Sequence, residues 1–226
     1  IVRNNFISDV QHNMTGGGSF STTFGVFGLM LASGTGHLVY NNSVNLNNAY
    51  AGTANSSLLS AAFGIIGTGQ TGIDVRNNIF SNTNSGGTTS IAHVAVYLPI
   101  SGTSAMNVTM NNNDYFSGST AGVHGVAHVG TTYTAVPAGP ATWAGLYTLA
   151  AFDPTLTTPN TNLRAYTSTL SAGGLNDNAS IKLDPLFVST TDLHLTAASP
   201  ARDVGAIIAA VTNDIDSQLR PGGNAL

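Results

Sequence analysis

The chain has 226 residues, of which 42% are apolar and only 7% are charged, and its formal net charge is −4. This length and apolar content suit one folded domain with a sizeable core and exclude an intrinsically disordered chain. Lysine and arginine together number six, so there is no basic patch to neutralise phosphates, which argues against a nucleic-acid partner.

Cysteine is absent, which excludes disulfides and thiolate metal sites. No apolar run approaches the roughly 18 residues of a membrane span, so we expect no direct membrane insertion. Residues 1–8 resemble neither a signal peptide nor a start with an initiator methionine. We therefore expect the chain to be a fragment of a longer protein.

Pairs of asparagines recur at nearly constant spacing. Their first members lie 37, 36 and 35 residues apart, which indicates an internal repeat of about 36 residues. The four pairs are Asn4 with Asn5, Asn41 with Asn42, Asn77 with Asn78, and Asn112 with Asn113.

Apolar segments lie between the pairs and are predicted to be strands at 24–31, 58–66, 91–98 and, more weakly, 121–129. Turns rich in Gly, Thr and Ser follow most of them, and each such turn is followed by a short β-branched strand that runs into the next asparagine pair. One repeat is thus strand, turn, strand, asparagine corner and loop.

A repeat of short strands fits either a propeller blade or a coil of a β-helix. Equivalent residues stack along the axis of a β-helix, so buried asparagines at one corner can hydrogen-bond to their copies in the coils on either side. Propeller blades hold equivalent residues too far apart for such a ladder, and their usual Trp-Asp or Gly-His signature is missing. We predict an all-β fold, a right-handed single-stranded parallel β-helix with coils of about 36 residues including loops, whose eight paired asparagines form a structural ladder.

The same spacing predicts columns of equivalent side chains. One inward column is expected to contain Val2, Val39, Val75 and Met110. A second is expected to contain Phe6, Val44, Phe80 and either Tyr115 or Phe116. An outward column contains Arg3, Tyr40, Arg76 and Asn111, which form either a solvated face or a strip that binds glycans.

The pattern changes after residue 130, where prolines and the single tryptophan, Trp143, enter. We assign 1–130 to β-helix coils with asparagine corners. Residues 131–226 are assigned to the terminal coils and end structure of the same domain.

Several motifs near the end of the chain resemble the terminal signature of bacterial right-handed β-helix proteins. These motifs are Asp184-Pro185-Leu186-Phe187, Asp192-Leu193-His194-Leu195, the run 199–205, Asp214-Ile215-Asp216 and Arg220-Pro221-Gly222. The signature belongs to the pectate-lyase-like superfamily and to surface proteins of the choice-of-anchor type. Segments 78–80, 113–116 and 179–181 are similar to very large Bacteroidota surface proteins that end in a type IX sorting domain. The resemblance implies secretion and attachment by outer-membrane secretion or anchoring machinery.

The superfamily contains polysaccharide lyases, which need clustered carboxylates for calcium and an arginine or lysine base on the same face. It also contains hydrolases, which need two or three aspartates at catalytic separation. Most of the ten aspartates lie in turn or terminal motifs, where capping of the backbone explains them. Asp74 beside Arg76 is the best acid–base pair, but the two lie on one strand. We therefore assign no catalytic residue and no cofactor.

Two histidines are the remaining candidates for a site. His93 and His128 lie 35 residues apart, one coil, and are predicted to stack. A metal ion needs three or four ligands and no third is evident, so we predict a structural pair and no metal site.

These expectations favour a non-catalytic segment of a secreted or cell-surface bacterial protein that acts as a stalk or adhesion module. A polysaccharide-binding or lyase-like protein is the alternative. Surface polysaccharides or other cell-surface components are the expected partners in either case.

Overall fold

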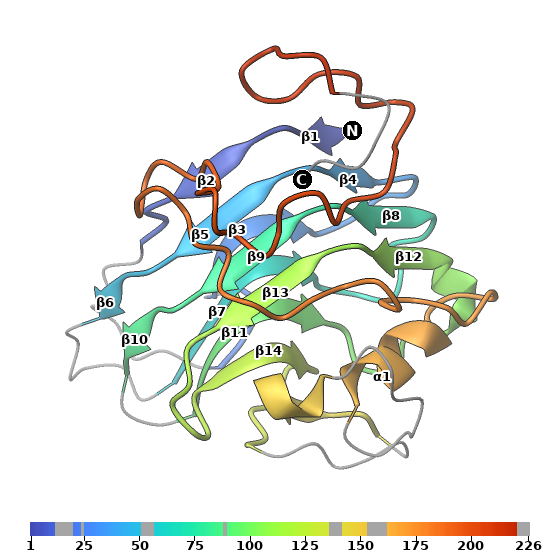
Figure 1. Ribbon diagram of the computed structural model, residues 1–226. Helices are drawn as coiled ribbons and strands as arrows, with labels where there is room; N and C mark the ends of the chain where they lie inside the picture. The colour runs from blue at the N-terminus through green and yellow to red at the C-terminus, as the bar shows by residue number, and fades with distance from the viewer. Residues whose placement is uncertain are drawn as a thin grey trace.

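The computed structural model describes residues 1–11, 20–23, 25–50, 57–87, 90–135, 142–152 and 162–220. Within these residues the chain passes repeatedly through the same three sheets and forms a parallel β-solenoid of about three turns, spaced about 35 residues apart (Figure 1). This confirms the predicted all-β, β-helical fold and excludes the propeller, because equivalent strands of successive repeats pair directly with one another.

The three sheets form the faces of the solenoid. Sheet A contains β1 (Val2–Arg3), β4 (Leu38–Tyr40), β8 (Ile73–Arg76) and β12 (Val108–Asn111). Sheet B contains β2 (Phe6–Ser8), β5 (Ser43–Leu46), β9 (Ile79–Asn82) and β13 (Asp114–Ser117). Sheet C contains β3 (Val26–Leu31), β7 (Leu58–Ile65), β11 (Ile91–Leu98), β14 (His124–Val129) and β15 (Gly145–Tyr147), the last antiparallel to β14. A short pair, β6 (Ala49–Tyr50) and β10 (Ser85–Gly86), extends beyond sheet B.

The apolar segments expected to be strands all lie in sheet C. The segment 91–98 coincides with β11, and 58–66 is one residue longer than β7. The weakest segment, 121–129, becomes a strand only from His124 onward, and Phe24 lies outside the described residues. Continuous apolar runs thus marked the buried strands, because β7, β11 and β14 are buried along their whole length, and a strand that is buried on both faces is apolar at successive positions.

The inward columns follow the register of the parallel pairs. In sheet A, Val2, Val39, Val75 and Met110 align, as predicted, and the last three are buried. In sheet B the aligned inward residues are Ile7, Val44, Phe80 and Tyr115. The prediction of Phe6 in this column was wrong by one residue, because side chains alternate along a strand and a shift of one turns Phe6 to the outer face.

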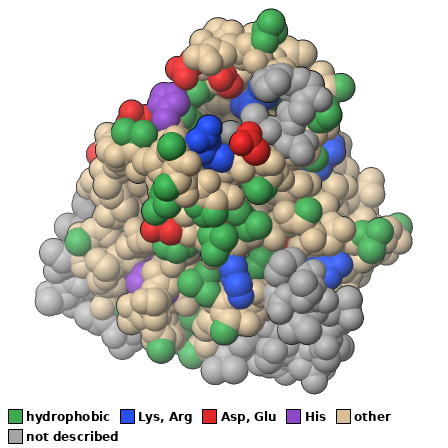
Figure 2. All heavy atoms as spheres, viewed as in Figure 1, with side chains coloured by type: hydrophobic (Ala, Val, Ile, Leu, Met, Phe, Trp, Pro, Cys, Tyr) green, Lys and Arg blue, Asp and Glu red, His purple; other side chains and the backbone are tan. Residues whose placement is uncertain are grey.

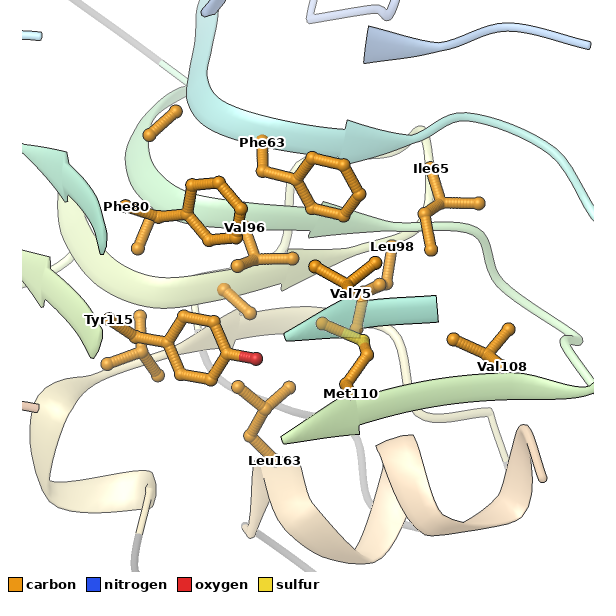
Figure 3. Close-up of a cluster of buried hydrophobic side chains, with 14 of the residues drawn as sticks. Phe63, Ile65, Val75, Phe80, Val96, Leu98, Val108, Met110, Tyr115 and Leu163 are labelled. Carbon is orange, nitrogen blue, oxygen red and sulfur yellow. The ribbon is translucent and has the colours of Figure 1, made fainter. Parts of the chain in front are cut away.

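Aromatic rings fill the interior between the sheets (Figure 3). The rings of Phe63 and Phe80 stack with centroids 4.9 Å apart, and Tyr115 continues the stack 6.3 Å from Phe80. Val75, Val108 and Met110 face these rings from sheet A, and Leu163 of the helix lies beneath them. Each coil is therefore stabilised by burial of apolar area against the next, as in other solenoids.

A cap covers the last coil. It consists of β15, a 3₁₀ turn η2 (Leu149–Ala151) and a helix α1 (Leu163–Thr169), while a second 3₁₀ turn, η1 (Ser104–Met106), lies between β11 and β12. Asn162 begins α1 by accepting a hydrogen bond from the backbone N–H of Arg164, a standard N-cap contact. Tyr166 and Leu170 are fully buried against the coil, so the apolar interior is closed at this end.

After α1 the chain returns along the solenoid toward its first coil (Figure 1). It forms a hairpin at 184–196, where Phe187 and Leu195 pair, then a segment that we call the strap, 204–213, and a terminal turn at 213–219. The side chain of Arg220 donates a hydrogen bond to Asn4 at 3.1 Å, so the described end of the chain lies beside the first coil.

Candidate functional site

The second asparagine of each pair forms an internal ladder. The side-chain amide of Asn5 donates to Asn42 Oδ1 at 2.7 Å, Asn42 donates to Asn78 Oδ1 at 2.9 Å, and Asn78 donates to Asn113 Oδ1 at 3.0 Å. The backbone N–H of each donor residue reaches the same oxygen. Ser180 continues the series by accepting from the backbone N–H of Asn113. This arrangement satisfies a row of buried polar groups at the corner between sheets A and B.

The first asparagine of each pair does not belong to this ladder, and that part of the sequence-based assignment was wrong. Asn4, Asn41, Asn77 and Asn112 have φ values of 54°, 53°, 60° and 53°. This left-handed conformation, which asparagine tolerates better than most residues, turns the chain from sheet A into sheet B and directs the side chain outward. These residues therefore form the corner of each coil, and their side chains can contact a segment that packs on its outer side.

The strap occupies that outer position. Asn112 Nδ2 donates to the carbonyl oxygen of Val204 at 3.1 Å, and Asn4 Nδ2 donates to that of Asn213 at 2.6 Å. Between them Asn77 donates to the carbonyl of Ala206 at 2.7 Å and accepts from its N–H at 2.8 Å. The strap thus crosses successive coils and is hydrogen-bonded to the asparagine corners of the first, third and fourth.

The proposed glycan strip lies partly under the same segment. Arg3, Tyr40, Arg76 and Asn111 align in sheet A, as expected for one column. The ring of Tyr40 is only 3% exposed because it packs against Ile208 and Val211. The strap covers that ring, so a sugar has no access to it. Arg3 donates to the strap carbonyl of Ala210, whereas Asn111 bonds to Asn178 and Ala179, outside the strap.

Charged groups reinforce this contact. Arg76 forms an ion pair with Asp74 at 2.5 Å and lies 5.5 Å from the centroid of the Tyr40 ring, within range of a cation–π interaction. The hydroxyl of Tyr40 donates to Asp74 at 2.7 Å. Burial and the neighbouring Asp74 raise the pKa of Tyr40. The Asp74 and Arg76 pair considered for acid–base chemistry is therefore engaged with Tyr40, the residue on which the strap packs.

The predicted stack of His93 on His128 was wrong. His93 aligns with His124, with ring centroids 5.6 Å apart, while His128 aligns with Tyr97. The interval from His93 to His124 is 31 residues because this coil is shorter than the 35-residue spacing of the asparagine corners. Corner spacing therefore does not fix the register of sheet C, which lies on the other side of a loop.

His93 sits in a buried polar network. Its Nδ1 lies 2.7 Å from Ser60 Oγ, and its Nε2 lies 3.1 Å from the carbonyl oxygen of Gly86. Asn82 and Asn84 donate to Ser60 Oγ from the adjoining corner. Burial, followed by the nearby His124, lowers the pKa of His93 to about 4. Ser60 and His93 are both fully buried, so this pairing connects β7 to β11 and has no surface at which a substrate could meet it.

Two carboxyl groups, those of Asp114 and Asp177, are buried at the last coil. Burial raises the pKa of Asp114 to about 7 and that of Asp177 to about 6. Asp177 accepts hydrogen bonds from the hydroxyls of Tyr115 and Ser180, whereas Asp114 accepts one from the N–H of Leu183. This burial depends on how the chain after α1 packs on the last coil, which the sequence pattern does not show.

A groove of about 380 Å³ lies between the outer face of sheet B and the hairpin. Its walls combine amides and hydroxyls from successive coils with two aromatic rings, one carboxylate and two aliphatic side chains. Figure 2 shows this side of the molecule as mostly uncharged, with apolar side chains near its middle. Leu186, in the wall, has a φ of 50°, an uncommon conformation for a leucine. The lining residues are Asn45, Asn47, Ser81, Thr83, Phe116, Asp184, Pro185, Leu186, Phe187, Ser189 and Thr190.

A second pocket, of about 300 Å³, lies where the hairpin meets the terminal turn and the start of sheet B. Phe6 and Ile79 contribute apolar surface, and His194 contributes its imidazole. Among the residues that the structure describes, no group of three or more histidine or aspartate side chains is arranged to hold a metal ion. No described helix has the length and apolarity needed to cross a membrane.

Comparison with known proteins finds no matching family model, no matching curated protein and no matching solved structure. The functional conclusion must come from the geometry described above.

Proposed function

We propose that this chain is a non-catalytic structural module of a bacterial cell-surface protein, acting as a stalk or adhesion module. The observation that carries the proposal is the double fastening of the coils. An amide ladder connects them inside the corner, and the strap crosses them outside it. Such fastening suits a part that must keep its shape while exposed to solvent and proteases.

The resemblance of the closing motifs extends this proposal to secretion by a type IX system and anchoring at the outer membrane of a Bacteroidota cell. Antibodies raised against the chain test it on intact source cells. We expect intact cells to be labelled without permeabilisation, and as strongly as permeabilised cells. Labelling only after permeabilisation would contradict the surface location.

The groove over sheet B favours a second candidate function, binding of a neutral polysaccharide. Sugar rings offer C–H faces that pack on aromatic rings and hydroxyls that bond to amides, and Phe116, Phe187, Asn47 and Thr83 supply both kinds of group in one groove. Because successive coils repeat the Asn45 and Ser81 column, the groove runs along the stack and suits a chain better than a monosaccharide.

A glycan array followed by titration calorimetry tests this candidate. We expect binding of at least one uncharged polysaccharide, abolished by Phe187→Ala and weakened by Asn47→Ala. Leu175→Ala is the matched control, because Leu175 is 68% exposed and does not line the groove. Binding that survives Phe187→Ala in a folded protein would remove the groove from consideration, and release of shortened sugars would contradict a non-catalytic role.

A further inference from the structure

The imidazole of His194 connects two parts of the chain after α1, the hairpin and the terminal turn. Its Nδ1 lies 2.5 Å from Asp192 Oδ1 within the hairpin, and its Nε2 lies 2.9 Å from Asp216 Oδ2 in the terminal turn. The three side chains, which we call the His194 bridge, are each nearly half exposed. Solvent protons therefore reach the bridge freely.

The bridge also rests on the first coil. The ring of Phe6 contacts the imidazole edge-on, with centroids 4.8 Å apart. Phe6 is the residue that sheet B turns outward, so the first coil, the hairpin and the terminal turn meet at one point. The pocket of about 300 Å³ lies at this junction, and its lining includes His194 and Asp216.

Both hydrogen bonds require a particular charge state of the ring. A carboxylate only accepts hydrogen bonds, and an imidazole carries N–H groups on both nitrogens only when it is protonated. A neutral ring would donate to one carboxylate and turn a lone pair toward the other. Only the imidazolium donates to both carboxylates at once.

Other charged groups around the junction do not replace this bridge. Among the described residues lining the pocket, Arg202, Asp214 and Arg220 are charged in addition to His194 and Asp216. Arg202 donates to the carbonyl of Ala197, and Arg220 donates to Asn4 and to the carbonyl of Asn213. Asp214 accepts from the backbone N–H groups of residues 216 and 218.

We propose that Asp192, His194 and Asp216 form a pH-sensitive closure that holds the hairpin to the terminal turn and releases it, opening the pocket, when the imidazolium loses its proton. The two carboxylates raise the pKa of His194, Asp192 first and Asp216 second. Because the pKa is raised in the closed form, the closure is fully stabilised below the ordinary histidine pKa and is lost as the pH rises through the raised value. It opens as the pH rises above the ordinary histidine range.

Because the chain has no cysteine, two cysteines introduced into one protein can carry a pair of spin labels, and the distance between the labels can be measured. Thr191→Cys reports the hairpin and Gln218→Cys the terminal turn, and both residues are exposed. At about pH 6 we expect one short distance, and at about pH 9 a second, longer population. His194→Gln should show the longer population at both pH values, and Asp216→Asn should move the midpoint to lower pH.

Asp203→Asn is the control for loss of one carboxylate, since Asp203 is exposed and has a left-handed backbone that asparagine accommodates. It should leave both the distances and the midpoint as in the parent. Distances that do not change with pH while the NMR signals of His194 titrate would overturn the proposal. So would a His194→Gln protein that keeps the short distance throughout.

Discussion

At the scale of single residues, neighbouring asparagines perform different tasks because their backbones differ. The backbone of Asn77 is in the left-handed conformation, and its side chain reaches outward to the strap. The backbone of Asn78 is not in that conformation, and its side chain reaches inward to the ladder. A pair is needed at each corner because one side chain cannot satisfy both positions. This division explains why the pairs recur together through the coils.

Replacement of a central ladder residue should be costly. Asn78→Leu removes the oxygen that accepts from the backbone N–H and the side-chain amide of Asn42, and it removes the side-chain donor that reaches Asn113 Oδ1 and the carbonyl of Val39, all buried. We expect the free energy of unfolding to fall by about 2–4 kcal/mol, since each orphaned buried group costs about 1–3 kcal/mol. Urea denaturation measures it.

The control for this change is Asn5→Leu at the open end of the ladder, where Asn5 is only part-buried and bonds to one neighbouring asparagine. A loss of about 1 kcal/mol or less is expected there. Equal losses at the two positions would show that the central hydrogen bonds are not the source of the effect.

The buried carboxyl groups give stability a pH dependence. The pKa of Asp114 is about 7 in the folded protein against a reference value of 3.8, so its contribution is fully present below 3.8 and is lost as the pH rises toward 7. His93 and His128 act in the opposite direction, because burial lowers their pKa values to about 4. Their contribution to the free energy of unfolding is lost as the pH falls from 6.5 to 4.

Because these trends oppose one another, the pH dependence of the parent's stability does not show the contribution of any one group. The substitution Asp114→Asn isolates the contribution of the Asp114 carboxyl group. The stability of this variant relative to the parent should rise by on the order of 2–4 kcal/mol between about pH 4 and pH 8, because only the parent must bury an ionisable carboxyl. Thermal denaturation across this range checks it. Asp203→Asn, at an exposed position, should give a flat difference, and a flat difference for Asp114→Asn would contradict the assigned burial.

At the scale of the elements, the strap depends on a small apolar contact as well as on hydrogen bonds. Ile208 is 9% exposed and packs on Tyr40, whereas its neighbour Ile207 is 61% exposed. Ile208→Asp should release the strap, because an unpaired charge would have to be buried. We expect faster hydrogen exchange at the N–H of Ala206, with the amides of β7 and β11 unchanged.

The adjacent substitution, Ile207→Asp, carries the same charge into solvent and should leave the exchange at Ala206 as in the parent. If both substitutions accelerate exchange equally, net charge and not the contact with Tyr40 controls the strap.

The sequence predicted the elements better than their lateral contacts. The corner asparagines revealed the repeat because a left-handed turn and an amide ladder place strict demands on residue type. The pairing of His93 was missed because the loops between sheets B and C vary in length. The strap was missed because its contact with Asn77 joins residues 129 apart, and no periodic pattern links a terminal segment to an outer corner.

At the scale of the whole molecule, the solenoid combines contacts between neighbouring coils with one lengthwise connection. Stacked coils alone are stabilised mainly by their neighbours, so terminal coils of solenoids open more easily than central ones. Here the cap covers the last coil, and the strap and Arg220 fasten the first. The two ends should therefore open together with the centre.

Native-state hydrogen exchange in increasing denaturant measures whether the two ends open with the centre. The strands to compare are β2 in the first coil and β13 in the last. We predict that their amides exchange through the same global opening, with free energies that agree within about 1 kcal/mol. Exchange of β2 through a separate opening of much lower free energy, while β13 stays protected, would contradict a solenoid fastened along its whole length.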